Sequence, residues 1–128
     1  MLATKLDHVV IHITDWERSN QFYQNVVGAE LVAMGSAFVY RFGEVQLNVH
    51  GPGTAPTPLA RIPVAPGGSD LCFEWTGTVE EAIQRLNSHQ VSIEVGPVKR
   101  IGVKGPGTSV YFRDPDDSLV EFIIYDQT

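Results

Sequence analysis

The chain has 128 residues, of which 43% are apolar and 19% are charged, and its formal net charge is -6 at pH 7. This balance is that of an ordinary folded domain, so it excludes disordered chains and membrane proteins. Lysine and arginine are not clustered, which excludes the phosphate-neutralising surfaces that nucleic acids and anionic membranes require. Cys72 has no second cysteine to pair with, and residues 1–5 hold no apolar run like that of a signal peptide, so we expect a cytoplasmic protein.

Residues 1–50 carry the pattern of one strand, one helix and three further strands. The first strand is predicted at residues 7–13, with Val9, Ile11 and Ile13 on one face and His8 and His12 on the other. Residues 14–17 match a capping box that starts a helix over residues 15–27, and Gly28 supplies the left-handed residue that ends it. Three short strands are then predicted, at residues 30–34, 38–42 and 45–50.

Residues 51–68 form a segment of different composition, with five of the eight prolines of the chain. Proline removes backbone donors and fixes the backbone angle φ, so a regular element is not expected here. We interpret this segment as a linker between residues 1–50 and residues 69–128.

The order of elements then starts again. Apolar Leu71, Phe73 and Trp75 alternate with polar residues, and a second capping box at residues 78–81 precedes an amphipathic helix. Three strands are predicted at residues 91–95, 109–112 and 119–124. The chain thus predicts two βαβββ repeats and an α+β fold class. Aligning the repeats brings two pairs of polar residues to equivalent positions, namely His8 with Asp70 and Asn48 with Glu121.

These features resemble the vicinal oxygen chelate superfamily, which includes glyoxalases, bleomycin-resistance proteins and dioxygenases. The resemblance is carried by Leu6–Val10, Phe22-Tyr23, Gly96-Pro97, Tyr111–Asp116 and Leu119–Glu121, and it is closest to glyoxalase-domain proteins of the lactoylglutathione lyase type. It implies a single domain over residues 1–128, in which each repeat curls its strands into an open cup of mixed sheet.

The resemblance also implies a divalent metal, held by one ligand from the first strand and one from the last strand of each repeat. Those positions are His8, Asn48, Asp70 and Glu121 here. The sequence departs from the family pattern in having Asp70 where many members have histidine and Asn48 where glyoxalase I has glutamate. His50 is the better ligand chemically, but side chains two apart on a strand lie about 6.5–7 Å from one another, so Asn48 and His50 are alternatives.

Three further residues are expected to contact the substrate, namely Gln46, Lys104 and Tyr111. Gln46 shares the polar face of its strand with Asn48 and His50, and His50 is itself a candidate for substrate contact or general acid–base work. Lys104 lies in the glycine-rich stretch at residues 102–107, which we interpret as a mobile lid or turn that could meet an anionic substrate.

The function predicted from these residues is that of a metal-dependent lyase or isomerase acting on a small, oxygen-chelating substrate. Glu121 would be both ligand and proton shuttle, and the ligand set suits Zn, Ni, Mn, Fe or Mg. Two alternatives stay open: a metal-free module that binds a small molecule such as an antibiotic, and an extradiol dioxygenase. Sheet edges left open by two cups of four strands further predict a homodimer.

Overall fold

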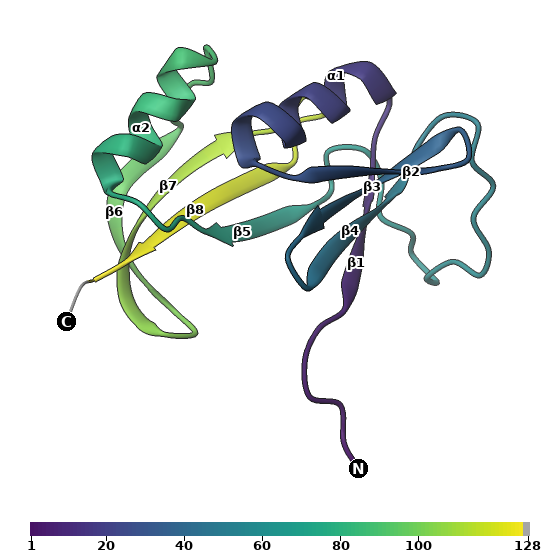
Figure 1. Cartoon of the computed structure of the whole chain (residues 1–128), viewed down its shortest axis with the longest axis horizontal. Helices are drawn as coiled ribbons and strands as arrows, with labels where there is room; N and C mark the ends of the chain where they lie inside the picture. The colour runs from purple at the N-terminus through teal and green to yellow at the C-terminus, as the bar shows by residue number, and fades with distance from the viewer. Residues whose placement is uncertain (127–128) are drawn as a thin grey trace. The chain divides into compact units, whose positions relative to one another are not determined.

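The computed structural model describes residues 1–126, which form two compact units divided between Ser69 and Asp70. The first unit contains one helix, continued by a π-helical turn, and four strands (Figure 1). In chain order its elements are β1 (His8–His12), α1 (Trp16–Phe22), η1 (Tyr23–Val27), β2 (Glu30–Met34), β3 (Ala37–Phe42) and β4 (Val45–His50).

The second unit repeats this composition with one helix and four strands (Figure 1). Its elements are β5 (Asp70–Glu74), α2 (Val79–Ser88), β6 (Val95–Gly102), β7 (Gly105–Arg113) and β8 (Leu119–Tyr125). Within residues 1–126, no helix is long and apolar enough to cross a membrane.

Both units have the same sheet topology. The strand order is β1-β4-β3-β2 in the first sheet and β5-β8-β7-β6 in the second, with the first pair of each sheet parallel and the other pairs antiparallel. This confirms the predicted α+β fold of two βαβββ repeats. The register agrees as well, because Val10 lies opposite Asn48 in one sheet and Cys72 lies opposite Glu121 in the other.

The two helices begin with different caps. Thr78 caps α2 in the predicted capping box, with Glu81 reaching back to the backbone N–H of Thr78. The predicted box at the start of α1 is wrong by one residue, because Asp15 and not Thr14 accepts the N–H of Arg18. A carboxylate is a strong N-cap, so it takes this role from the neighbouring threonine.

One strand prediction in the second unit is wrong. The strand expected at residues 91–95 begins only at Val95, because the N–H of Val91 closes the end of α2 by donating to the carbonyl of Leu86. Of the two alternatives for residues 102–107, a lid or a turn, the structure has the turn: a tight hairpin in which only Val103 and Lys104 separate β6 from β7. Ladder pairing along β6 and β7 therefore outweighs the low strand propensity of their glycines and prolines.

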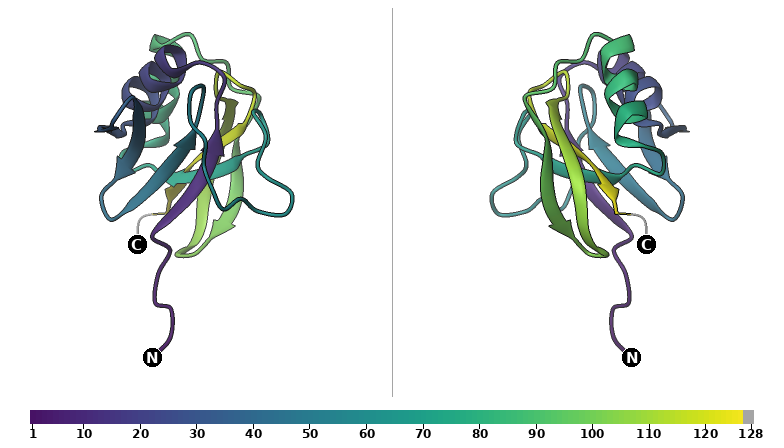
Figure 2. Two further views of the ribbon diagram at one scale, coloured as in Figure 1. Left: turned by 90° about the vertical axis from the view of Figure 1, so that its right-hand side faces the viewer. Right: turned by 90° about the vertical axis from the view of Figure 1, so that its left-hand side faces the viewer.

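In each unit the core lies between the helix and one face of its sheet, as Figure 2 shows for both helices. Tyr23, Tyr40 and Leu47 are buried in the first unit, and Leu86, Phe112 and Phe122 are buried in the second. Side chains alternate across a strand, so the residues next to the buried strand residues, such as Leu47 and Phe122, lie on the opposite face of the sheet. That opposite face carries the candidate site residues.

Candidate functional site

The first unit gathers polar side chains on neighbouring strands β1 and β4. His8 lies opposite Gln46, and His12 lies opposite His50, with Asn48 between them on β4. These positions are two residues apart along each strand, so all five side chains share the face of the sheet that faces away from the core. The structure therefore brings together all of the candidate residues predicted in the first repeat.

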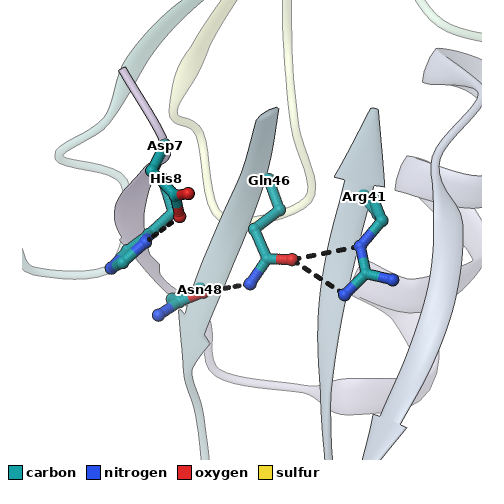
Figure 3. Close-up of polar contacts among 5 residues, drawn as sticks. All are labelled: Asp7, His8, Arg41, Gln46 and Asn48. Atoms are coloured by element: carbon teal, nitrogen blue, oxygen red, sulfur yellow. Dashed lines mark hydrogen bonds and ion pairs between the residues drawn. The ribbon is translucent and has the colours of Figure 1, made fainter. Parts of the chain in front are cut away.

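His8 is oriented by the residue before it. Its Nδ1 lies 2.8 Å from Oδ1 of Asp7, as Figure 3 shows. A carboxylate accepts the Nδ1 proton, which leaves the lone pair of Nε2 directed outward. Histidines that bind metals are usually held in this way by a second group on the other ring nitrogen. Asp7 was not among the predicted site residues, although its position directly before His8 in the sequence was a usable signal.

A chain of amide hydrogen bonds orients Asn48. The guanidinium of Arg41 donates to Oε1 of Gln46 over 3.1 and 3.2 Å, and Nε2 of Gln46 donates to Oδ1 of Asn48 over 2.8 Å (Figure 3). Arginine can only donate, so it binds the oxygen of the Gln46 amide and leaves the NH2 group to face Asn48. Asn48 consequently receives one hydrogen bond at its oxygen, and this oxygen keeps a second lone pair.

His50 and His12 form a pair of imidazoles at the far end of the same strands. Their ring centroids lie 6.4 Å apart in an edge-on arrangement, and Nδ1 of His12 lies 3.1 Å from the carbonyl oxygen of Val64. Burial, together with the neighbouring His12, lowers the pKa of His50 below its usual value. His50 is therefore a neutral imidazole at neutral pH, able to accept one hydrogen bond and donate another.

A pocket of about 880 Å³ opens on this polar face of the first unit. Its floor includes His8, Asn48 and His50, and its wall is the linker, with three prolines and the apolar residues Leu59 and Ile62. The volume is within the range of small-molecule sites. The sequence predicted a linker that Leu59, Ile62 and Val64 could pin to the surface. Leu59 and Ile62 are instead exposed, and the contribution of the linker to a pocket was missed.

The second unit presents carboxylates at the equivalent positions. Asp70 and Cys72 lie on the same face of β5, and Glu121 lies on β8 between Cys72 and Tyr111. The hydroxyl of Ser109 donates to Oε2 of Glu121 over 2.6 Å. Ser109 is fully buried, and a buried hydroxyl needs a hydrogen-bonding partner, which the sequence analysis did not predict.

Cys72 lies beside Glu121 and is a poor nucleophile. Burial, followed by the charge and hydrogen bonding of Glu121, raises the pKa of the Cys72 thiol to about 12. The thiolate is the reactive and metal-binding form of cysteine, and it is scarcely populated at neutral pH here. Cys72 therefore adds a small neutral side chain to this face.

The basic side chains of the second unit that could have paired with Glu121 have other partners. Arg113 forms a bidentate ion pair with Glu94, at 2.8 and 3.2 Å. This pair lowers the pKa of the Glu94 carboxyl and raises that of the guanidinium. Among residues 1–126, no salt bridge to Glu121 is present, so its carboxylate has hydrogen-bonding partners in Ser109 and Cys72 but no counter-charge.

Two of the predicted substrate contacts in the second unit are likewise engaged. Lys104 lies in the β6–β7 hairpin and pairs with Glu74 at 2.9 Å, and the hydroxyl of Tyr111 accepts a hydrogen bond from Nε of Arg100 at 2.9 Å. Either residue would have to exchange this partner to contact a substrate. Gln46, the third predicted contact, is held between Arg41 and Asn48.

The described residues of each unit offer two potential metal ligands, not a complete set. Within residues 1–69, and equally within residues 70–126, no three histidine, cysteine, aspartate or glutamate side chains form a metal-binding group. The pair in the first unit is neutral, His8 with Asn48, and the pair in the second is anionic, Asp70 with Glu121. Nitrogen and oxygen donors of this kind fit a divalent ion of the first transition series or magnesium.

Comparison with known proteins identifies the family. The model of the Glyoxalase/Bleomycin resistance protein/Dioxygenase superfamily matches residues 5–122. The chain is 37% identical over 121 residues to the glyoxalase domain-containing protein RDO1 of Mycosarcoma maydis, covering 94% of this chain and 68% of that protein. It is 32% identical over 126 residues to virulence protein STM3117 of Salmonella typhimurium, covering 98% of this chain and 87% of that protein.

Solved structures agree. The integron cassette protein VCH_CASS1 from V. cholerae superposes with a TM-score of 0.90 at 36% identity, with 98% of both chains covered. Two more distant structures share the fold: FosX from Listeria monocytogenes, solved with Mn(II) and a dihydroxypropylphosphonic acid (TM-score 0.68, 20% identity, 98% and 93% covered), and TnmS3, an antibiotic-binding protein from Streptomyces (TM-score 0.72, 21% identity, 98% and 99% covered). The chain therefore belongs to the glyoxalase/bleomycin resistance protein/dioxygenase superfamily, as its sequence motifs predicted.

Proposed function

We propose that the chain is a divalent-metal-dependent enzyme of the lyase or isomerase type, acting on a small substrate with two neighbouring oxygen atoms. The observation that carries this proposal is the repeated register. His8 and Asn48 on β1 and β4 occupy the same positions as Asp70 and Glu121 on β5 and β8. These are the two positions in each repeat at which the family resemblance implies a metal ligand, and the agreement of their register supports one ion held by all four residues.

The chemistry of the donors supports the metal. Nε2 of His8 is left as an acceptor by the contact of Nδ1 with Asp7, and Oε1 of Glu121 is left free of the Ser109 hydrogen bond to Oε2. An imidazole nitrogen and carboxylate oxygens are ligands for Zn, Ni, Mn, Fe and Mg alike. In the distant relative FosX, the same fold was solved with Mn(II).

We assign the fourth ligand position to Asn48 rather than to His50. His8 lies opposite Gln46, so His50 is four residues further along β4, or about 13 Å at the rise of an extended strand. One ion cannot be bound by side chains so far apart, whereas Asn48 is two residues along. Asn48 would bind through the lone pair of Oδ1 that Gln46 does not use, and His50 is left to contact the substrate.

A divalent ion held by these residues would supply Lewis acidity to two adjacent substrate oxygens. The chain itself would supply proton transfer. Glu121 is the expected base, because Ser109 fixes its Oε2 and leaves Oε1 to take a proton from substrate carbon or oxygen and to return it. Cys72, which stays protonated beside it, would not compete as a nucleophile.

We further propose that the protein is a homodimer. Each sheet ends in unpaired edge strands, β1 and β2 in the first unit and β5 and β6 in the second. Open edges favour pairing with another chain, and most soluble oligomers are closed twofold dimers. Sedimentation velocity at micromolar concentration should give twice the chain mass of 14.1 kDa, and a monomer mass would contradict the proposal.

A metal-free binding module is the second candidate function, and the pocket of the first unit favours it. That pocket has a suitable volume and an apolar wall without using a carboxylate. In the distant relative TnmS3 the same fold binds an antibiotic. In this case the polar face would serve only to form hydrogen bonds with the ligand.

Chelation distinguishes the two candidates. Protein purified without chelator should contain a divalent ion, and it should turn over at least one of three substrate classes: a glutathione hemithioacetal, an epoxide with a thiol, or an epimerisable 2-substituted acyl compound. EDTA should abolish this turnover, and adding back metal should restore it. Ligand binding that is unaffected by EDTA, together with no turnover of any class, would support the binding module instead.

A further inference from the structure

The linker wall of the first-unit pocket indicates which part of a substrate it receives. We propose that this pocket binds an uncharged, apolar body of the substrate, packed between the linker and the polar face of β1 and β4. This inference rests on the proposed function, because it assigns the substrate class of the same site. The substrate would be a small molecule with an aromatic or branched aliphatic body next to the oxygen atoms that the metal would bind.

The apolar surface of the wall is exposed. Ile62 is 88% exposed and Leu59 is 53% exposed, and both line the pocket. Apolar area that is left in water is a source of binding free energy for any molecule that covers it. With three prolines in the same wall, the contact surface is also stiff, so little conformational entropy would be lost on binding.

The lining selects against charge. None of the fourteen residues that line this pocket is a lysine, arginine, aspartate or glutamate. Arg61 lies within the linker, but it is not part of the lining. An ionic group packed against the linker wall, away from His8 and Asn48, would lose hydration without gaining a counter-charge from the wall, which disfavours its binding there. An uncharged apolar body has no hydrated charge to lose, so it can bind against this wall without that penalty.

Two hydrogen bonds hold the linker in place against the first unit. The indole N–H of Trp16 donates to the carbonyl of Pro52 over 2.8 Å, and within the linker the Thr54 hydroxyl closes a turn by donating to the carbonyl of Gly51 over 2.7 Å. At the other end, His12 contacts the carbonyl of Val64. The wall is therefore fixed at both ends before a ligand arrives, which is the condition for a preformed site.

Two fluorescent probes that differ by one charge test the proposal. N-phenyl-1-naphthylamine is neutral, and 8-anilino-1-naphthalenesulfonate has the same ring system with a sulfonate. At about 0.15 M salt, where charges more than about 8 Å away are screened, the neutral probe should bind about tenfold more tightly. Equal affinity of the two probes, or tighter binding of the sulfonate, would overturn the proposal.

A matched pair of isoleucine variants locates the probe. Ile62→Ser changes an exposed isoleucine of the wall, and Ile101→Ser changes an isoleucine of β6 that is 83% exposed and lines no part of this pocket. Ile62→Ser should weaken binding of the neutral probe about fivefold, as expected from the apolar area removed, and Ile101→Ser should leave it unchanged. Equal effects of both variants on probe affinity would overturn the proposal. It would also be overturned if the wild type did not bind the probe and Ile62→Ser changed the oligomeric state, because the wall would then be covered by a protein surface.

Asp70→Ala separates this inference from the proposed function. Asp70 is a proposed metal ligand on β5 that lines no part of this pocket, so the variant should lose metal but keep its affinity for the neutral probe. Loss of probe affinity in Asp70→Ala while Ile62→Ser has no effect would overturn the pocket assignment. Probe binding as expected in a wild-type protein that takes up no metal would leave the pocket standing and would count against the metal-dependent enzyme alone.

Discussion

The two halves of the chain share one framework but carry opposite chemistry on it. Strand order and register agree position by position, and even the fully buried aromatic residues Tyr40 and Phe112 are equivalent. On the outward face, the first half has neutral donors and a pocket with an apolar wall, while the second half has two carboxylates and Ser109. A duplicated fold therefore keeps its core pattern while its exposed face diverges.

This difference indicates that the two halves have different roles. The carboxylates that can bind a cation lie in the second half, and the pocket that can hold a neutral molecule lies in the first. Carboxylates bind divalent ions by charge as well as geometry, whereas an amide or imidazole contributes only its lone pair. Variants at equivalent positions of the two halves should therefore have unequal effects, and these inequalities provide the tests that follow.

The largest expected difference is between Glu121→Ala and Asn48→Ala. Loss of the carboxylate should weaken the affinity for Mn²⁺ or Zn²⁺ about 100-fold or more, whereas loss of the neutral amide should weaken it about tenfold. Competition with a chelator dye measures both affinities. Glu121→Gln controls for shape, and it should behave more like Glu121→Ala. Equal losses in Asn48→Ala and Glu121→Ala would break the proposed asymmetry.

The next difference concerns Tyr40 and Phe112, the buried aromatic residues at equivalent positions of the two halves. The Tyr40 hydroxyl lies 2.8 Å from Oγ of Ser19 and 2.6 Å from Oδ1 of Asn20. Tyr40→Phe should lower the free energy of unfolding by about 1–2 kcal/mol, because it leaves these groups without their partner. Phe112→Tyr should cost about 2–3 kcal/mol, because it buries a new hydroxyl in an apolar core. Urea denaturation measures both, and a neutral Phe112→Tyr would show that the second core tolerates polarity as well as the first.

A smaller effect is expected at Asp7, whose counterpart in the second half is Ser69. Asp7→Asn removes the carboxylate from Nδ1 of His8, and metal affinity should fall about tenfold. Glu44→Gln is a matched control, because it removes one exposed negative charge of the first half that pairs with Lys5 and not with His8. Equal effects of these two variants would mean that net charge, and not orientation of His8, determines the affinity.

The smallest expected effect is a pH-dependent one at Cys72, which has apolar Val10 as its counterpart in the first half. In metal-free protein, iodoacetamide should react with Cys72 far more slowly at pH 8 than in the unfolded chain, because the thiol pKa is raised to about 12 and the thiolate is the reactive form. Glu121→Gln removes one cause of this raised pKa, so the rate should increase severalfold. An unchanged rate in Glu121→Gln would show that burial alone keeps Cys72 protonated.

The repeat was predictable from the sequence because it depends on local patterns. Alternating apolar residues define β1, β4, β5 and β8, and these strands carry every candidate ligand. The hairpin of β6 and β7 was misjudged because its glycines and prolines have low strand propensity, and only pairing with a neighbouring strand reveals it.

The sequence named candidate site residues but not their partners. The repeat brought His8, Asn48, Asp70 and Glu121 to equivalent positions, and the family resemblance implied their role as ligands, which stays a prediction. The Asp7 carboxylate and the Ser109 hydroxyl that orient them, and the linker that forms a wall beside them, depend on contacts between residues on different elements. Side-chain partners of this kind are set by register and folding of the linker, for which a single sequence holds no direct signal.

The central claim is that the neutral pair of the first half and the anionic pair of the second bind the same ion. The most direct test of this claim is the metal content of three proteins: the wild type, His8→Ala and Asp70→Ala. Each protein is reconstituted with Mn²⁺ and passed through a desalting column, and its metal content is measured by mass spectrometry. The account predicts one ion per chain in the wild type and a substoichiometric content in both variants. Full metal content in either variant, or none in the reconstituted wild type, would contradict it.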